Sequence, residues 1–207
     1  MKGLYIFKGW YSKKLSRFID TAVRYNISPD FFTYLGIVAA LFGGIALWRG
    51  YWLLAGVLIA VRLAGANLDG AVARARKRAR PFGFVLNEIG DRAGDAFLFI
   101  GVLLYGMGSS EVILVLLALS LFTASLPTFI SLSGSSIGVA RINGGPFGKT
   151  ERCLFLFLTV GFAEILKAKE IVLLVAAVIF ILGSLLTAFY RIYLIKIALN
   201  RGEGGEA

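Results

Sequence analysis

The sequence predicts an all-α integral membrane protein in which six transmembrane helices follow an N-terminal amphipathic helix at the membrane interface. The 207 residues are 58% hydrophobic and 16% charged, with a mean hydropathy of +0.80. Soluble globular chains are about 45–50% apolar and about 25% charged, so this composition excludes most soluble enzymes. The apolar residues gather in runs close to the ~20 residues that a helix needs to cross a bilayer. Most positively charged residues lie outside these runs, as in multi-pass membrane proteins.

Residues 1–26 have the pattern of an amphipathic helix that lies on the membrane surface. The apolar residues between Trp10 and Val23 recur at helical spacing, and lysine and arginine side chains occupy the other face. Because such charges interrupt the apolar residues, we expect no secretory signal peptide here. The segment 26–30 ends this helix, and Pro29 suits the first turn of the next one.

Six apolar runs then form one predicted transmembrane domain at 27–199, before a flexible tail at 200–207. The predicted spans are 31–48, 51–73, 88–107, 111–130, 150–166 and 171–197. Of the 22 lysines and arginines, 18 fall on one side of the predicted membrane and three on the other, while Arg62 lies within a span. Positive residues favour the cytoplasmic side, so we expect a cell-membrane protein with both termini in the cytoplasm. The net charge of +10 then reflects topology and anionic lipid, with no nucleic-acid partner.

The chemistry available to this chain is limited to a few residue types. It contains no histidine and one cysteine, Cys153, which excludes a Cys/His zinc cluster and an internal disulfide. Ionisable groups inside a membrane are costly and usually functional, and Asp69, Asp91 and Asp95 lie in the second and third predicted spans. Asn87, Asp91 and Asp95 share one arc of the third helix. Oxygen ligands without histidine or cysteine favour Mg²⁺ or Mn²⁺.

The stretch 66–91 contains a motif of aspartate, glycine, alanine and arginine residues at fixed spacing. Its members are Asp69, Gly70, Ala73, Arg74, Gly83 and Asp91. They fill six of the eight fixed positions of D-x2-D-G-x2-A-R-x8-G-x3-D-x3-D, the signature of the CDP-alcohol phosphatidyltransferases, which this sequence resembles. The segment Pro29-Asp30-Phe31-Phe32-Thr33 is also similar to the family's P-N-x-L-T at the start of the first span. The resemblance covers most of the chain.

The sequence departs from the signature at its first and third aspartates, which are Ala66 and Asn87 here. In the family, four carboxylates hold two divalent ions, and the last carboxylate is the general base. The resemblance therefore implies a Mg²⁺ or Mn²⁺ site formed by Asp69, Asn87 and Asp91, with Asp91 also the catalytic base. Asp95, one helical turn beyond Asp91, is a further expected ligand. Two alternatives remain open: a reaction that uses one metal ion, and a metal site displaced by one turn along the helix.

The resemblance implies transfer of a phosphatidyl group from CDP-diacylglycerol, or from an ether-lipid counterpart, to an alcohol with release of CMP. The residues expected to bind the CDP-lipid are Asp30, Thr33, Gly70, Ala73, Arg74, Arg80 and Gly83. Four basic residues either anchor helices at the membrane interface or bind the phosphate of a phosphorylated acceptor: Arg141, Lys149, Arg152 and Arg191. We name Arg141, Lys149 and Arg191 as candidates for phosphate binding. The resemblance also implies a homodimer surrounded by membrane lipids.

Two other functions stay open at this point. A non-catalytic relative would bind a CDP-lipid or act as a scaffold, and the loss of two signature aspartates favours this reading. A small membrane transporter would use the intramembrane carboxylates for ions or protons. Simpler interpretations also exist for single features. The basic joint at 74–80 follows from membrane topology, Glu88 and Asp95 suit the start of a helix, and Gly65 suits close helix packing.

Overall fold

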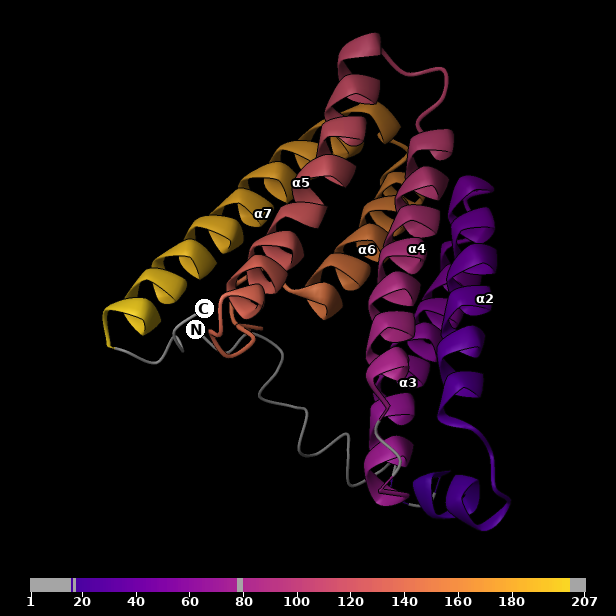
Figure 1. Cartoon of the computed structure of the whole chain (residues 1–207). Helices are drawn as coiled ribbons and strands as arrows, with labels where there is room; N and C mark the ends of the chain where they lie inside the picture. The colour runs from indigo at the N-terminus through magenta and orange to yellow at the C-terminus, as the bar shows by residue number, and fades with distance from the viewer. Residues whose placement is uncertain (1–15, 17, 78–79, 202–207) are drawn as a thin grey trace.

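The computed structural model describes residues 16, 18–77 and 80–201, and every regular element within these ranges is helical (Figure 1). A short helix covers residues 18–24. The long helices are α2 (Pro29–Trp48), α3 (Trp52–Ala75), α4 (Pro81–Tyr105), α5 (Glu111–Ser136), α6 (Lys149–Leu166) and α7 (Lys169–Asn200). The predicted all-α fold class is confirmed for the described part of the chain.

Each predicted span corresponds to one of these helices, and two of the helices, α4 and α5, extend at one end by more than a helical turn beyond the prediction. α4 begins at Pro81 instead of at 88, because proline in the first turn has a suitable fixed φ angle and lacks only an N–H that would be unpaired there. α5 continues to Ser136 instead of ending at 130. In its last turns, the hydroxyls of Ser133 and Ser135 donate to carbonyls one turn back, over 2.9 and 3.1 Å, so the helix absorbs these polar residues.

The helix ends follow local sequence signals. The Ser28 hydroxyl oxygen accepts a hydrogen bond from the Asp30 amide over 3.3 Å, and Pro29 lies in the first turn of α2, as predicted. Between α2 and α3, Gly50 has a φ angle of +74°, in the left-handed region that glycine adopts without strain.

Four of the described helices, α2, α3, α5 and α7, are long and apolar enough to cross a membrane. α4 and α6 contain a higher proportion of charged residues, among them Asp91 and Arg152. The count of six spans therefore stays a prediction. Most of the predicted interfacial helix at 1–26 lies outside the described residues. So do residues 202–207 of the predicted tail at 200–207, whose first residue, Asn200, belongs to α7.

The helices form two groups joined by α6. α2 packs mainly against α3 and α4, whereas α5 packs mainly against α7. Figure 1 shows the α5 and α7 pair inclined away from α2, α3 and α4. α6 contacts α3, α4 and α7, so it bridges the two groups.

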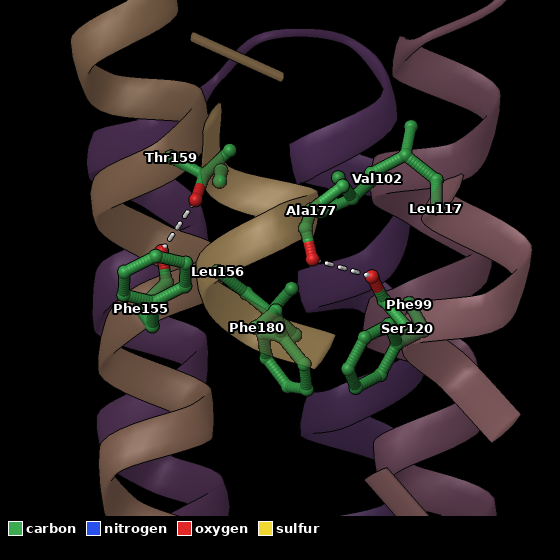
Figure 2. A pocket seen from close by; sticks show the side chains of 10 residues that line it. Phe99, Val102, Leu117, Ser120, Phe155, Leu156, Thr159, Ala177 and Phe180 are labelled. Atoms are coloured by element: carbon green, nitrogen blue, oxygen red, sulfur yellow. Dashed lines mark hydrogen bonds between the residues drawn. The ribbon is translucent and has the colours of Figure 1, made fainter. Parts of the chain in front are cut away.

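A small apolar cavity lies where α4, α5, α6 and α7 meet (Figure 2). The ring of Phe180 packs edge-on against Phe99, with 4.7 Å between ring centroids. The hydroxyl of Thr159 donates over 2.8 Å to a carbonyl one turn back in α6, and that of Ser120 donates to the Ala177 carbonyl over 3.4 Å. Because the backbone satisfies both hydroxyls, the cavity presents hydrocarbon and offers no chemistry of its own.

Two helix pairs touch through their backbones. A methyl group on Gly101 of α4 would collide with the backbone of Gly44 in α2. A methyl group on Gly65 of α3 would lie 2.6 Å from the carbonyl oxygen of Phe32. The interpretation of Gly65 as a packing residue is therefore confirmed, and α2 is held close to both neighbours.

We expect Gly101→Leu to destabilise the protein, because the added side chain forces α4 away from α2. Overpacking of this kind costs about 1–3 kcal/mol, which thermal unfolding in detergent micelles would detect as a lower midpoint. Ile100→Leu is the matched control, because the neighbouring Ile100 side chain is 43% exposed. Equal midpoints for the two variants would contradict the backbone contact.

Candidate functional site

A polar pocket lies where α2, α3 and α4 meet. Its lining residues are Thr33, Gly36 and Ile37 of α2, Arg62, Ala66 and Asp69 of α3, and Asn87, Gly90 and Asp91 of α4. Asn87 and Asp91 share a face of α4 because they are four residues apart. The structure thus brings four of the predicted site residues together: Thr33, Asp69, Asn87 and Asp91.

Asp69 is buried, and three donors orient its carboxylate. Oδ2 accepts hydrogen bonds from Thr33 Oγ1 over 2.9 Å and from Asn87 Nδ2 over 3.2 Å. Oδ1 accepts from the Gly70 amide over 2.5 Å. At the two altered signature positions, Asn87 therefore contacts Asp69 directly, whereas Ala66 adds only a methyl group to the pocket wall.

Asp91 is paired with a lysine from a different helix. Nζ of Lys149, the first residue of α6, lies 2.5 Å from Asp91 Oδ1. Both side chains are partly accessible, with 18% of the Asp91 side chain and 25% of the Lys149 side chain exposed. The second oxygen, Oδ2, has no hydrogen-bond partner among the described residues. One oxygen of Asp91 is therefore available for a proton or a ligand.

Asp95 lies one turn further along α4 and has different surroundings. Its Oδ1 is 2.6 Å from Arg62 Nη2, and its Oδ2 is 2.7 Å from Arg152 Nη2 and 3.5 Å from Arg92 Nη1. The side chain is buried and does not line the pocket. Guanidinium groups occupy both carboxylate oxygens, so this geometry gives no support to the predicted metal-ligand role of Asp95.

Arg152 has a role that the sequence did not predict, since it was expected to anchor a helix at the interface or to bind phosphate. The structure buries Arg152 to 2% exposure against Asp95. An arginine at the start of an apolar run was the available signal, because buried charges in spans need partners.

Two further ion pairs involve predicted contact residues. Arg80 Nη2 lies 2.9 and 2.7 Å from the two carboxylate oxygens of Asp30, which ties the start of α2 to the start of α4. Arg141 pairs with Glu88 over 2.5 Å. The second oxygen of Glu88 is buried and has no partner among the described residues.

Arg191 departs from the predicted pattern, because its guanidinium binds backbone carbonyls and pairs with no carboxylate among the described residues. Its guanidinium donates to the carbonyls of Pro127, Gly144 and Asn143 over 2.6, 3.0 and 3.3 Å. The side chain is buried, and from α7 it holds the connection at 137–148, which joins α5 to α6. These contacts leave Arg191 poorly placed to bind an acceptor phosphate.

The remaining motif residues lie at the facing ends of α3 and α4. Arg74 is exposed, and its Nη1 lies 3.2 Å from the position that a methyl group on Gly70 would take. Ala73 is half-buried. A methyl group on Gly83 would have no atom within 4 Å. Helix packing in this chain therefore gives no reason for a glycine at 83.

The donor set of the pocket fits one divalent cation. The described residues contain no group of three or more aspartate, glutamate, histidine or cysteine side chains suited to a metal ion. The pocket offers two carboxylates, Asp69 and Asp91, and the amide oxygen of Asn87. Mg²⁺ is commonly bound by one or two carboxylates together with substrate phosphates. One ion completed by a phosphate fits this arrangement, whereas two ions would lack ligands.

The sequence matches one protein family over most of its length. The family CDP-alcohol phosphatidyltransferase matches residues 26–199. An archaetidylinositol phosphate synthase from Pyrococcus horikoshii is 28% identical over 191 residues, which cover 91% of this chain and 94% of that protein. A phosphatidylinositol phosphate synthase from Streptomyces avermitilis is 25% identical over 196 residues, which cover 91% of this chain and 80% of that protein.

The fold is also similar to solved structures of the phosphatidylinositol phosphate synthase from Mycobacterium tuberculosis. The structure with CDP-DAG bound has a TM-score of 0.72 and 22% identity, and the match covers 86% of this chain and 92% of that chain. The structure in complex with manganese and citrate has a TM-score of 0.71 and 23% identity, with 87% and 88% covered. These similarities establish the helical fold.

We expect Asp95→Asn to lower stability much more than Asp91→Asn. Without the Asp95 charge, Arg62 and Arg152 are buried with no carboxylate partner, at a cost of about 3–5 kcal/mol. Asp91 is partly exposed and pairs with a single lysine. Unfolding midpoints in detergent would compare the two variants. Loss of Mn²⁺ binding in a folded Asp95→Asn protein would instead restore Asp95 as a metal ligand.

Proposed function

The chain belongs to the CDP-alcohol phosphatidyltransferase family, and from this premise we propose that it transfers a phosphatidyl group from a CDP-lipid to an alcohol and releases CMP. The donor is CDP-diacylglycerol or an ether-lipid counterpart. The observation that carries the proposal is the polar pocket, in which Asp69, Asn87 and Asp91 occupy motif positions and converge with Thr33 among apolar helices.

In the proposed reaction, Asp91 is the general base. Its Oδ2 accepts the hydroxyl proton of the alcohol, whose oxygen forms a bond to the phosphorus that carries the lipid. The bond from this phosphorus to the oxygen bridging to CMP breaks, and CMP leaves with the bonding electrons. The chain contributes positioning and charge neutralisation, which dominate catalysis of phosphoryl transfer.

The pocket residues also supply the proposed metal site. Asp69, Asn87 and Asp91 would hold Mg²⁺ or Mn²⁺, which when bound neutralises negative charge on the pyrophosphate. The hydrogen bonds from Thr33 and Gly70 keep the Asp69 carboxylate in one orientation for this task.

The facing ends of α3 and α4 are assigned to the nucleotide. Arg74 would contact its phosphates, and Gly70 and Gly83 would let it approach the backbone. Asp30 and Thr33 would lie on the cytidine side. Ala73 would leave room beside them, and the ion pair between Arg80 and Asp30 holds this edge of the site together.

We propose a phosphorylated alcohol, such as an inositol phosphate, as the acceptor. Lys149 and Arg141 contact α4 from α6 and from the connection that precedes it, and cationic side chains of this kind bind phosphate. Relatives of this chain are named phosphatidylinositol phosphate synthase and archaetidylinositol phosphate synthase, so their names specify lipids that carry inositol phosphate. Arg191 is left out, because its guanidinium already binds three carbonyls.

The proposal includes six membrane spans, with the pocket and both termini on the cytoplasmic side, and a homodimer. Asp30, Arg74 and Arg80 lie together at the pocket end of α2, α3 and α4, and basic residues favour the cytoplasmic face. Large apolar side chains such as Phe129 and Phe189 are 68% and 67% exposed, which suits contact with lipid or a second copy.

A non-catalytic CDP-lipid-binding relative is the second candidate. Ala66 favours it, because a methyl group replaces an oxygen ligand in the pocket wall. Family membership removes the main reason for the transporter hypothesis.

A CMP-release assay separates the two candidates. Purified protein is incubated with CDP-diacylglycerol, Mg²⁺ or Mn²⁺, and either inositol, inositol phosphate, glycerol or glycerol phosphate. We expect CMP with a phosphorylated acceptor, and a loss of at least about 100-fold in Asp91→Ala, since a general base contributes 10²–10⁴-fold. Binding of CDP-diacylglycerol without CMP release for any acceptor or metal would identify the non-catalytic relative.

Gly83→Ala should reduce activity without reducing stability. The added methyl group meets no atom of the described residues within 4 Å, and alanine has a higher helix propensity than glycine. The unfolding midpoint should therefore stay equal or rise, while the KM for the CDP-lipid should increase at least about tenfold. A variant with unchanged KM would show that Gly83 does not face the nucleotide.

A further inference from the structure

We propose that the pocket holds a single divalent cation and that the ammonium group of Lys149 supplies a second positive charge beside Asp91. This inference rests on the proposed function and deepens it. It gives the two departures from the family signature, Ala66 and Asn87, a common explanation: the site has lost two carboxylates together with the second divalent ion that they would hold.

The position of Lys149 is set by a buried contact one turn along α6. Arg152 lies three residues after Lys149 on the same helical face, and its guanidinium is fixed 2.7 Å from Asp95. Asp91 and Asp95 are likewise one turn apart on α4. The two helices therefore contact through two successive ion pairs. The inner pair, Arg152–Asp95, is buried, and it fixes the register that brings Lys149 to Asp91.

Before substrate binds, the charges at the pocket favour one divalent ion over two. Asp69 and Asp91 carry two negative charges, and Asn87 and Ala66 carry none. The Lys149 ammonium beside Asp91 offsets one of the two negative charges. One divalent ion then leaves a net charge of +1, whereas two ions would leave +3.

A protein cation also lines the pocket itself. Arg62 is one turn before Ala66 on α3, and its Nη2 donates to the Asp91 backbone carbonyl over 3.2 Å. It is 2% exposed. A further divalent ion between Ala66 and Asp91 would lie beside both Arg62 and Lys149, and Asp95, the carboxylate that pairs with Arg62, is not among the pocket residues.

Mn²⁺ binding tests the inference independently of turnover. Purified full-length protein in detergent is titrated with Mn²⁺, and free Mn²⁺ is measured by electron paramagnetic resonance. We expect one Mn²⁺ per wild-type chain. Two ions per wild-type chain would overturn the inference, even if CMP release is observed. If no acceptor gives CMP release, the proposed function is wrong, but the measured number of Mn²⁺ ions per chain still tests this inference.

Variants at position 149 test the role of the ammonium group. Lys149→Gln removes a repulsive positive charge, so Mn²⁺ affinity should rise about tenfold or more, while kcat at saturating Mn²⁺ and acceptor falls. Lys149→Arg keeps the charge and should leave Mn²⁺ affinity near the wild-type value. Lys169→Gln is the matched control, because Lys169 lies at the other end of the helices, where it donates to the Met107 carbonyl. Unchanged Mn²⁺ affinity in Lys149→Gln would overturn the inference.

Restoring the lost carboxylates should restore the second ion. The triple variant Ala66→Asp/Asn87→Asp/Lys149→Gln, if it elutes as folded protein in size-exclusion chromatography, should bind two Mn²⁺ per chain. A folded triple variant that binds one ion would contradict the explanation for Ala66 and Asn87. If the triple variant does not fold, the wild-type stoichiometry and Lys149→Gln decide the question.

Discussion

The ion pairs of Asp95 with Arg62 and Arg152 are the interaction on which the rest of this structure depends. They join α3, α4 and α6 in the interior of the bundle, where all three side chains are buried. A charge in such a place is tolerated only if it stays paired. Movement of any one of the three helices would leave a charge without its partner. The ion pairs therefore determine that α3, α4 and α6 pack together and in which register. Cys153 beside them accepts a further hydrogen bond from Arg62.

The same anchor positions the pocket. One helical turn from each member of the buried group lies a residue of the site: Ala66 after Arg62 on α3, Asp91 before Asp95 on α4, and Lys149 before Arg152 on α6. Helical geometry transmits the register of the buried layer to the pocket layer without further contacts. A site held rigidly by these buried ion pairs suits a reaction in which catalysis consists mainly of positioning and charge neutralisation.

The carboxylates around the pocket illustrate how a membrane protein accommodates acidic groups. Thr33, Asn87 and the Gly70 amide bind Asp69, Lys149 pairs with Asp91, and Arg141 pairs with Glu88. Each partner lowers the cost of holding a negative charge among apolar helices. The partners differ in strength, because Asp69 has neutral donors and Asp91 has a full positive charge. Asp91 nevertheless keeps one oxygen without a partner among the described residues, whereas both oxygens of Asp69 accept hydrogen bonds.

Composition, apolar runs and motif spacing were sufficient to predict the helices and the convergence of Asp69, Asn87 and Asp91. These features are local: hydrophobic length sets a span, and residues four apart share a helical face. Pro81 was a local signal for the start of α4, but the predicted span began at 88. The partners of Asp95 and Arg191 lie 57 and 64 residues away, at Arg152 and at the Pro127 carbonyl, and no pattern in the chain specifies them. The sequence by itself determined which charges need a partner inside the membrane. Only the packing of α3, α4, α6 and α7 decided which partner each one has, because that choice depends on helix register across large sequence separations.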